Sequence, residues 1–224
     1  MRAHAWFLAT LALIAGFIVF VFSLVVLKPS QEGSNGEAAK RELTPLERPM
    51  VAFGDPVKGS RDAKVTIVTF GDFGCAPCGT LAATLSEAIT RRPQDVRVVW
   101  KDLPNPSLHP GATDAAMAAR CAAEQGAFWE YHDVLFGTRS TLSVAALGEV
   151  ATAVGLDRGA FDDCLSTGRT RPIVERSVEE AIRLRVDATP TIFIDDRRLT
   201  GAIGAEALNA AIDDAIARAA SPSP

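Results

Sequence analysis

Long apolar runs and short polar interruptions divide the chain into segments of different character. The first run, Trp6–Leu27, has 22 residues and no charge. At about 1.5 Å per residue it would extend roughly 33 Å, which is enough to cross a bilayer. It runs into Lys28-Pro29 without the Ala-x-Ala pattern of a signal-peptide cleavage site. We therefore expect a transmembrane anchor over residues 1–28, with a cleaved signal peptide as the alternative.

The next segment, residues 29–50, is polar and contains Gly, Ser and Pro. Such a composition is typical of a flexible tether. The globular domain is expected over residues 51–219, followed by a tail at 220–224. Met50–Phe53 could form a short edge strand at the start of the domain.

The domain begins with a strand–helix–strand pattern. Residues 64–70 are β-branched and almost continuously apolar, which indicates a buried strand. Leu81, Leu85 and Ile89 then recur at helical spacing within residues 79–92, and 96–100 reads as a second strong strand. This order predicts two parallel strands joined by a right-handed crossover.

An Ala-rich block with helical periodicity follows, over about 111–186. Ser143 and Asp157 stand where helix N-caps are expected, and Gly155 marks a helix end. After the block, two short strands turn at Asp195-Asp196 and a last amphipathic helix closes the domain. The order predicts an α/β thioredoxin fold with an inserted helical domain. The expected block helices are 111–125, 127–136, 143–153, 157–167 and 170–185, and the later elements are strands 191–194 and 198–200 and helix 205–219.

Charge and cysteine content narrow the function classes. The 224-residue chain has a net charge of -4, so it lacks the basic surface of a nucleic-acid-binding protein. It has four cysteines, two of them close together and two far apart. Disulfides persist mainly outside the reducing cytosol, so an extracytoplasmic domain is the setting in which these cysteines pair.

The stretch Cys75-Ala76-Pro77-Cys78 lies between the first strand and its helix. Cys75 then falls at a helix N-terminus, where backbone N–H groups and the helix dipole stabilise a thiolate, the nucleophile of disulfide exchange. Cys78, one turn later, can resolve a mixed disulfide. A zinc site would need two further ligands, and His109 and His132 do not form a second ligand pair. We therefore predict a redox dithiol and no metal.

From these residues the chain resembles the DsbA-type thiol:disulfide oxidoreductases of the thioredoxin superfamily, in the membrane-anchored, BdbD-like bacterial branch. The resemblance covers residues 51–219 and implies no organic cofactor. It is carried by Phe70-Gly71-Asp72-Phe73-Gly74-Cys75-Ala76-Pro77-Cys78, Asp102-Leu103-Pro104, His109-Pro110, Ala118-Ala119-Arg120-Cys121-Ala122, Gln125–His132, Ala188–Ile194 and Gly201-Ala202.

The resemblance implies roles for individual residues. Cys75 would be the nucleophile and Cys78 the resolving cysteine. Pro190 would be a cis-proline facing them, and the backbone of Thr189 would pair with a bound substrate peptide. Substrates would be exported proteins with cysteine thiols, and reoxidation would need a quinone-linked membrane partner of the DsbB or VKOR type.

Three positions depart from the family pattern. The family often has a buried acid six residues before the first cysteine, where this chain has Thr69, and Asp72 is the nearest carboxylate. Lys101, beside Asp102, could supply a charge near the dithiol or could be a solvated strand end. Ala76-Pro77 differs from the dipeptide of many strong oxidases, and this pair tunes the reduction potential.

The distant cysteines, Cys121 and Cys164, fall in separate helices of the inserted block. A disulfide between them would close a 44-residue loop and contribute about 4 kcal/mol in the chain-entropy model. Some relatives carry a second disulfide in this region, and a pair of free buried thiols is the alternative. His109 and His132 are interpreted as capping or packing residues, with a role as acid or base as the alternative.

Together these features predict an enzyme that introduces disulfides into exported proteins. It would be a single-pass protein of the cytoplasmic membrane with its catalytic domain outside the cytoplasm. A reductase or isomerase of the same fold remains open, because the Ala76-Pro77 dipeptide leaves the direction of electron flow undecided. A non-catalytic metal- or peptide-binding module is the alternative from another class.

Overall fold

The computed structural model describes residues 46–138 and 141–221. The expected anchor (1–28), the tether up to residue 45 and the tail residues 222–224 lie outside them. None of the helices in the described ranges has the length and apolar character needed to cross a membrane.

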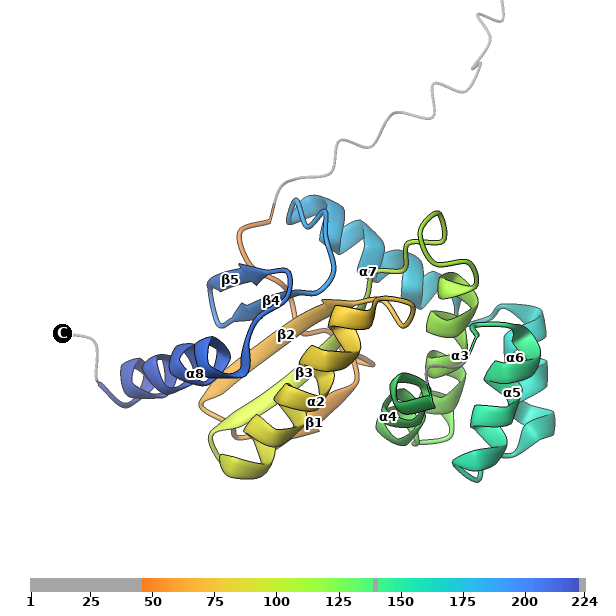
Figure 1. Cartoon of the computed structure of the whole chain (residues 1–224), viewed down its shortest axis with the longest axis horizontal. Helices are drawn as coiled ribbons and strands as arrows, with labels where there is room; N and C mark the ends of the chain where they lie inside the picture. The colour runs from red at the N-terminus through yellow and green to blue at the C-terminus, as the bar shows by residue number, and fades with distance from the viewer. Residues whose placement is uncertain (1–45, 139–140, 222–224) are drawn as a thin grey trace, which may run out of the picture. The chain divides into compact units, whose positions relative to one another are not determined.

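A five-stranded mixed sheet forms the centre of the domain (Figure 1). Its order is β1-β3-β2-β4-β5. The predicted parallel pair, β2 with β3, and the predicted hairpin, β4 with β5, are both present, and the other pairings are antiparallel. The bounds are β1 Val57–Gly59, β2 Val65–Gly71, β3 Val96–Asp102, β4 Thr191–Ile194 and β5 Arg197–Thr200.

The edge strand is not at residues 50–53, where the sequence placed it. It is β1, which pairs with β3. The reason is a turn formed by Asp55, whose Oδ2 accepts a hydrogen bond from Ala52 N at 2.7 Å while its own N donates to Ala52 O at 3.1 Å. Upstream, Met50 N donates to Glu180 Oε1 at 2.6 Å, so this segment is held by a helix and not by the sheet.

The two faces of the sheet carry different helices. Val65 and Ile67 pack with apolar residues of α2 (Ala76–Arg91) and α8 (Ala205–Ala220). Val68 and Phe70 pack instead with α7 (Arg171–Arg183). Because side chains alternate along a strand, position 69 belongs to the α2 face.

The helical insertion lies beside the sheet (Figure 1). All five predicted helices are present within two residues of their expected ends, and Ser143 and Asp157 accept the predicted capping bonds from Ala146 N and Ala160 N. α3 is lined with buried alanines, which let its neighbours approach closely. Besides α7, the block contains α3 Ala112–Glu124, α4 Phe128–Thr138, α5 Val144–Ala153 and α6 Arg158–Thr167.

A disulfide joins Cys121 of α3 to Cys164 of α6, with a Cα–Cα distance of 5.8 Å. It is the pairing that the sequence favoured. Both residues are buried in the core of the insertion. The bond therefore ties together two helices that are distant in the chain.

The double variant Cys121→Ala/Cys164→Ala is expected to unfold at a lower urea concentration, with a loss of about 2–4 kcal/mol, because the unfolded chain gains the freedom that the crosslink removed. Urea titration followed by circular dichroism measures this change. Ser166→Ala, on the exposed side of α6, serves as a control and should stay within about 0.5 kcal/mol. An unchanged midpoint in the double variant would contradict the expectation.

Candidate redox site

Cys75 is the N-cap of α2, and it is joined to Cys78 by a disulfide. Its Sγ accepts a hydrogen bond from Cys78 N at 3.3 Å, so the sulfur lies against the free N–H groups of the first turn. An N-terminus of this kind favours negative charge. The site is therefore built to stabilise a thiolate at Cys75 when the disulfide is reduced.

A second segment approaches the same sulfur from the loop before β4. The Thr189–Pro190 peptide bond is cis. Cys75 Sγ lies 3.6 Å from Thr189 O. Pro190 is buried and Thr189 is partly exposed. The carbonyl edge beside the sulfur can thus accept a hydrogen bond from an added peptide strand.

Two open grooves meet at Cys75. The first, here called the proline-loop groove, runs between the loop that follows β3 and the loop that precedes Pro190. The second, here called the apolar groove, runs between α2, α4 and the segment after β5. Cys75, Ala76 and Pro77 border both. The other lining residues include Leu103, Asn105, Leu108, His109, Ala188 and Thr189 in the first groove and Phe73, Leu81, Leu135, Phe136, Leu142 and Ile203 in the second.

Asp72 organises the loops around Cys75. Its buried carboxylate accepts hydrogen bonds from Gly74 N at 2.7 Å and Asn105 N at 2.8 Å, and its Oδ2 lies 2.8 Å from His109 Nδ1. Gly74 allows the approach, because a Cβ there would lie 2.4 Å from His109 Cβ. Asp72 thus positions the turn before the dithiol, and it does not border the enclosed space behind Cys78.

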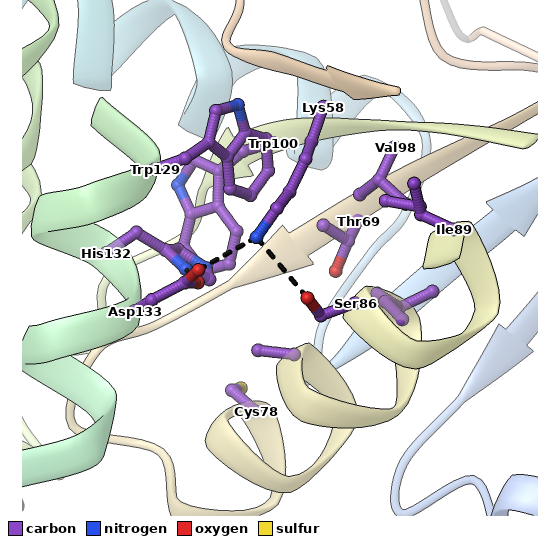
Figure 2. A pocket seen from close by; sticks show the side chains of 12 residues that line it. Lys58, Thr69, Cys78, Ser86, Ile89, Val98, Trp100, Trp129, His132 and Asp133 are labelled. Atoms are coloured by element: carbon purple, nitrogen blue, oxygen red, sulfur yellow. Dashed lines mark hydrogen bonds and ion pairs between the residues drawn. The ribbon is translucent and has the colours of Figure 1, made fainter. Parts of the chain in front are cut away.

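The space behind Cys78 is a small cavity between α2, α4 and the sheet, here called the Cys78 cavity (Figure 2). About 20 Å³ of it is open to the centre of a water molecule, which is room for one buried water. Cys78 borders this cavity and neither groove, whereas Cys75 borders the grooves and not the cavity. The polar and aromatic lining residues are Lys58, Thr69, Ser86, Trp100, Trp129, His132 and Asp133.

A chain of polar contacts crosses the Cys78 cavity. Lys58 Nζ donates to Asp133 Oδ2 at 2.8 Å and lies 3.4 Å from Ser86 Oγ. On the other side of the carboxylate, His132 Nδ1 lies 2.8 Å from Asp133 Oδ1. Figure 2 shows the Lys58 ammonium reaching from β1 between Asp133 of α4 and Ser86 of α2.

Burial and these contacts set the ionisation of the His132–Asp133 pair. Burial lowers the pKa of His132 below its usual 6.5, and the hydrogen bond to Asp133 opposes this only in part. Burial alone would raise the pKa of Asp133, but its hydrogen bonds with His132 and Lys58 outweigh that effect and lower it. The pair is therefore a neutral imidazole held by a carboxylate at neutral pH.

Lys101 is not a solvated strand end, and it does not line the Cys78 cavity or either groove. Its register partner on β2 is Phe70, so its side chain points to the α7 face, away from Cys78. There its Nζ forms buried ion pairs with Asp55 Oδ2 and Glu180 Oε2, each at 2.7 Å.

Asp102 is also buried, on the other face. Its carboxylate accepts hydrogen bonds from Trp100 Nε1 at 2.7 Å and from Arg120 Nε at 2.6 Å. The Lys101-Asp102 dipeptide thus supplies two separate buried ion clusters, one on each side of the sheet, because successive side chains of a strand point in opposite directions.

The sequence interpretation missed the polar lining of the Cys78 cavity. Lys58 precedes the first predicted strand, and His132 had been assigned to packing among aromatic residues. One signal for His132 was available in the sequence. It shares the buried face of α4 with Phe128, Tyr131 and Leu135, and a polar side chain on an apolar, buried face often has a functional role. Within the described ranges, His, Cys, Asp and Glu side chains form no group of three or more that could hold a metal ion.

The family model described as Thioredoxin matches residues 52–214. Among curated proteins, the Na(+)/H(+) antiporter NhaA 3 of Salinispora tropica is 37% identical over 200 residues, which are 89% of this chain and 30% of that protein. The chain spans between a quarter and a third of the length of this and other curated relatives, which are also named as Na(+)/H(+) antiporters.

Solved structures share the fold. Oxidised BdbD from Bacillus subtilis superposes with a TM-score of 0.67 at 22% identity, covering 73% of this chain and 94% of that one. A thioredoxin-like oxidoreductase from Silicibacter pomeroyi gives a TM-score of 0.66 at 26% identity, covering 75% and 93%. The chain therefore belongs to the thioredoxin superfamily, with the fold and the cysteine pair of a thiol:disulfide oxidoreductase.

Proposed function

We propose that this chain introduces disulfides into exported proteins through Cys75 and Cys78. The observation that carries the proposal is the position of Cys75 Sγ. It accepts a hydrogen bond from Cys78 N at the start of α2 and lies 3.6 Å from Thr189 O. A sulfur held in this way is a good leaving group and can be reached from both grooves.

In the proposed reaction, a substrate thiolate attacks Cys75 Sγ. The Cys75–Cys78 bond breaks, a mixed disulfide forms at Cys75, and Cys78 leaves as a thiolate that takes up a proton. A second substrate thiolate then attacks the substrate sulfur of the mixed disulfide. The substrate leaves with its disulfide, and Cys75 and Cys78 keep the two electrons as a dithiol.

The grooves fit an extended peptide. Thr189 offers its carbonyl as the edge of an added strand, and the cis Pro190 beside it offers no N–H or side-chain ligand. Leu108, beside the proline-loop groove, is 71% exposed. This apolar side chain would contact a peptide bound in the groove.

Reduction or isomerisation of disulfides is the second candidate, and the Ala76-Pro77 dipeptide favours it. Both residues are exposed in the turn of the dithiol, so they add no side chain that stabilises the Cys75 thiolate. The potential would then depend on the helix N-terminus alone. A less oxidising dithiol follows from weaker stabilisation of its reduced form.

The location and partners are part of the proposal. The apolar run Trp6–Leu27 would hold the chain in the cytoplasmic membrane, with the thioredoxin domain outside the cytoplasm, where disulfides persist. A quinone-linked membrane protein would reoxidise Cys75 and Cys78. Although the curated relatives are named as antiporters, we propose disulfide exchange for this chain because its described residues carry the thioredoxin fold and the cysteine pair.

The reduction potential of the Cys75–Cys78 pair decides between the two directions. For an oxidase we expect a reduction potential of about -120 mV, where strong thiol oxidants lie. The purified full chain is equilibrated in glutathione redox buffers, and the fraction of free Cys75 and Cys78 thiols is measured by mass spectrometry after alkylation. A reduction potential of about -270 mV, as in thioredoxin, would contradict the oxidase proposal and support the reductase proposal.

A further inference from the structure

Cys78 cannot attack a mixed disulfide until its thiol loses a proton. The residue is 3% exposed and borders only the Cys78 cavity, so bulk water does not reach it directly. Its strand neighbour across that cavity is Thr69, which has no carboxyl group. The proton must therefore pass to another group that lines the same space.

His132 has the form of a proton acceptor. A carboxylate can only accept hydrogen bonds, so the ring nitrogen 2.8 Å from Asp133, Nδ1, carries the proton. In the neutral imidazole, Nε2 then presents a lone pair. Nε2 is buried and has no hydrogen-bond partner among residues 46–138 and 141–221. A residue present only for packing would not leave a buried acceptor unpaired, because that costs free energy.

The aromatic neighbours of His132 hold the ring but do not pair with Nε2. Trp100, Phe136 and Phe73 lie at centroid distances of 4.8, 4.9 and 5.6 Å, each in an edge-to-face arrangement. The orientation of the ring is thus fixed by packing on one side and by Asp133 on the other. A base oriented by a carboxylate is a recurring arrangement in nucleophilic catalysis.

We propose that His132 accepts the proton of the Cys78 thiol, directly or through one water in the Cys78 cavity, when Cys78 attacks a mixed disulfide at Cys75. The inference rests on the proposed exchange chemistry of Cys75. The Cys78 thiolate forms the bond to Cys75 Sγ, and the bond from Cys75 to the partner sulfur breaks. The partner leaves as a thiolate with the two electrons, and the proton stays on His132. The step is the same for either direction of electron flow.

The proton can leave the imidazolium by an exit at the surface. Asp133 is 50% exposed at its side chain and Lys58 is 28% exposed. Asp133 and Ser86 also border an open groove on the outer side of α2 and α4. The polar contacts through Asp133 and Lys58 therefore connect His132 with solvent.

The charges around His132 come from three elements. Asp133 of α4 and Asp102 of β3 favour the imidazolium, and Lys58 of β1 disfavours it. Asp102 is itself paired with Arg120 of α3, and α2 faces the cavity with the uncharged Ser86. Burial lowers the pKa of His132 below 6.5, so the ring is unprotonated and ready to accept at neutral pH.

The test separates the two chemical steps on the reduced full chain, with Cys121–Cys164 left intact. Rapid mixing with excess dithiobis(nitrobenzoate) releases one coloured thiolate when Cys75 attacks the reagent, at a rate proportional to its concentration. A second coloured thiolate is released when Cys78 attacks the mixed disulfide at Cys75, at a rate independent of the reagent concentration. The first phase tests the proposed function and the second tests the role of His132.

In His132→Gln, we expect an unchanged first phase and a second phase slowed by about 10²-fold at pH 7, a typical loss for a missing general base. The wild-type second phase should level off by about pH 7. That of the variant should keep rising toward about pH 8.5, where unassisted thiols ionise. Adding Thr69→Asp to His132→Gln places a carboxyl on the same cavity wall and should restore the second phase by about tenfold.

If His132→Gln does not fold, Asp133→Asn provides a second test. The side chain of Asp133 is half exposed, so its replacement is expected to leave the fold intact. It should slow only the second phase, since the imidazolium loses its counter-charge. Glu124→Gln, which removes the same charge from a surface pair with Arg169, is the matched control and should change neither phase. A normal first phase with a wild-type second-phase rate and pH profile in the folded variants would overturn the proposal. Loss of the first phase in the wild type would instead refute the function of Cys75.

Discussion

The variant Cys75→Ser is expected to lose thiol–disulfide exchange down to the uncatalysed rate. Serine has nearly the size of cysteine and can cap α2 in the same way, so the fold should be retained. A hydroxyl does not ionise near neutral pH and forms no disulfide, so the reacting atom is lost and its surroundings are kept. The measurement is the oxidation of a peptide with two cysteines by stoichiometric full-length protein, followed by mass spectrometry.

The companion variant Cys78→Ser should behave differently. Cys75 remains in place, so it can still attack a disulfide, but no second thiol can release the product. We expect one mixed disulfide per chain to accumulate at Cys75. Thr84→Ala, on α2 and outside both grooves, should oxidise the peptide like the wild type. Equal exchange rates in Cys75→Ser and the wild type would mean that another residue is the nucleophile.

Replacing Lys101 by Met should lower the free energy of unfolding by about 3–5 kcal/mol. The Lys101 ammonium lies 2.7 Å from one oxygen each of Asp55 and Glu180, and all three side chains are buried. Methionine has a similar length and no charge. Its introduction would leave two carboxylates in a dry site without a cation, which costs far more than the loss of a surface pair. Urea unfolding at neutral pH measures the difference.

Lys64→Met is the matched control for this prediction. Lys64 also forms an ion pair, with Asp95 at 2.8 Å, but its side chain is 55% exposed. Exposed pairs contribute little, so the expected loss is below about 1 kcal/mol. If the two lysine variants were equally stable, the buried cluster would not hold the domain together as described.

The elements of the fold could be predicted because their signals are local. A strand such as 65–71 shows its burial in a continuous apolar run, and the helices of the insertion show theirs in period and caps. The edge strand was misplaced because the segment around Met50 is held by Glu180, which it meets only after folding. Local patterns cannot report a contact between residues so far apart.

The candidate site divides in the same way. Cys75 and Cys78 can be recognised in the sequence by their spacing and by their position between a strand and a helix. Lys58, His132 and Asp133 do not, because a β-strand edge, a helix of the insertion and α2 must first come together to make the cavity that they share. His132 looks like a packing residue in the sequence because its neighbours are aromatic.

The burial of Lys101 could not be predicted from the sequence, because it depends on α7 covering that face of the sheet. A lysine at a strand end is usually solvated, and the sequence contains no sign that α7 would cover it. The register with Phe70 then decides on which side of the sheet it lies. A one-residue shift would have placed the same charge behind the dithiol.

The segment that enters the domain at Leu46 has a mechanical consequence. Leu46 N donates to Arg183 O, and Met50 N donates to Glu180, so the chain arrives along α7, where Lys101 links Glu180 to strand β3. Tension applied at residue 46 would load these bonds before any other part of the domain. The force would reach the sheet through the face opposite α2. A pull on residue 46 would therefore leave the geometry of the Cys75–Cys78 turn unchanged.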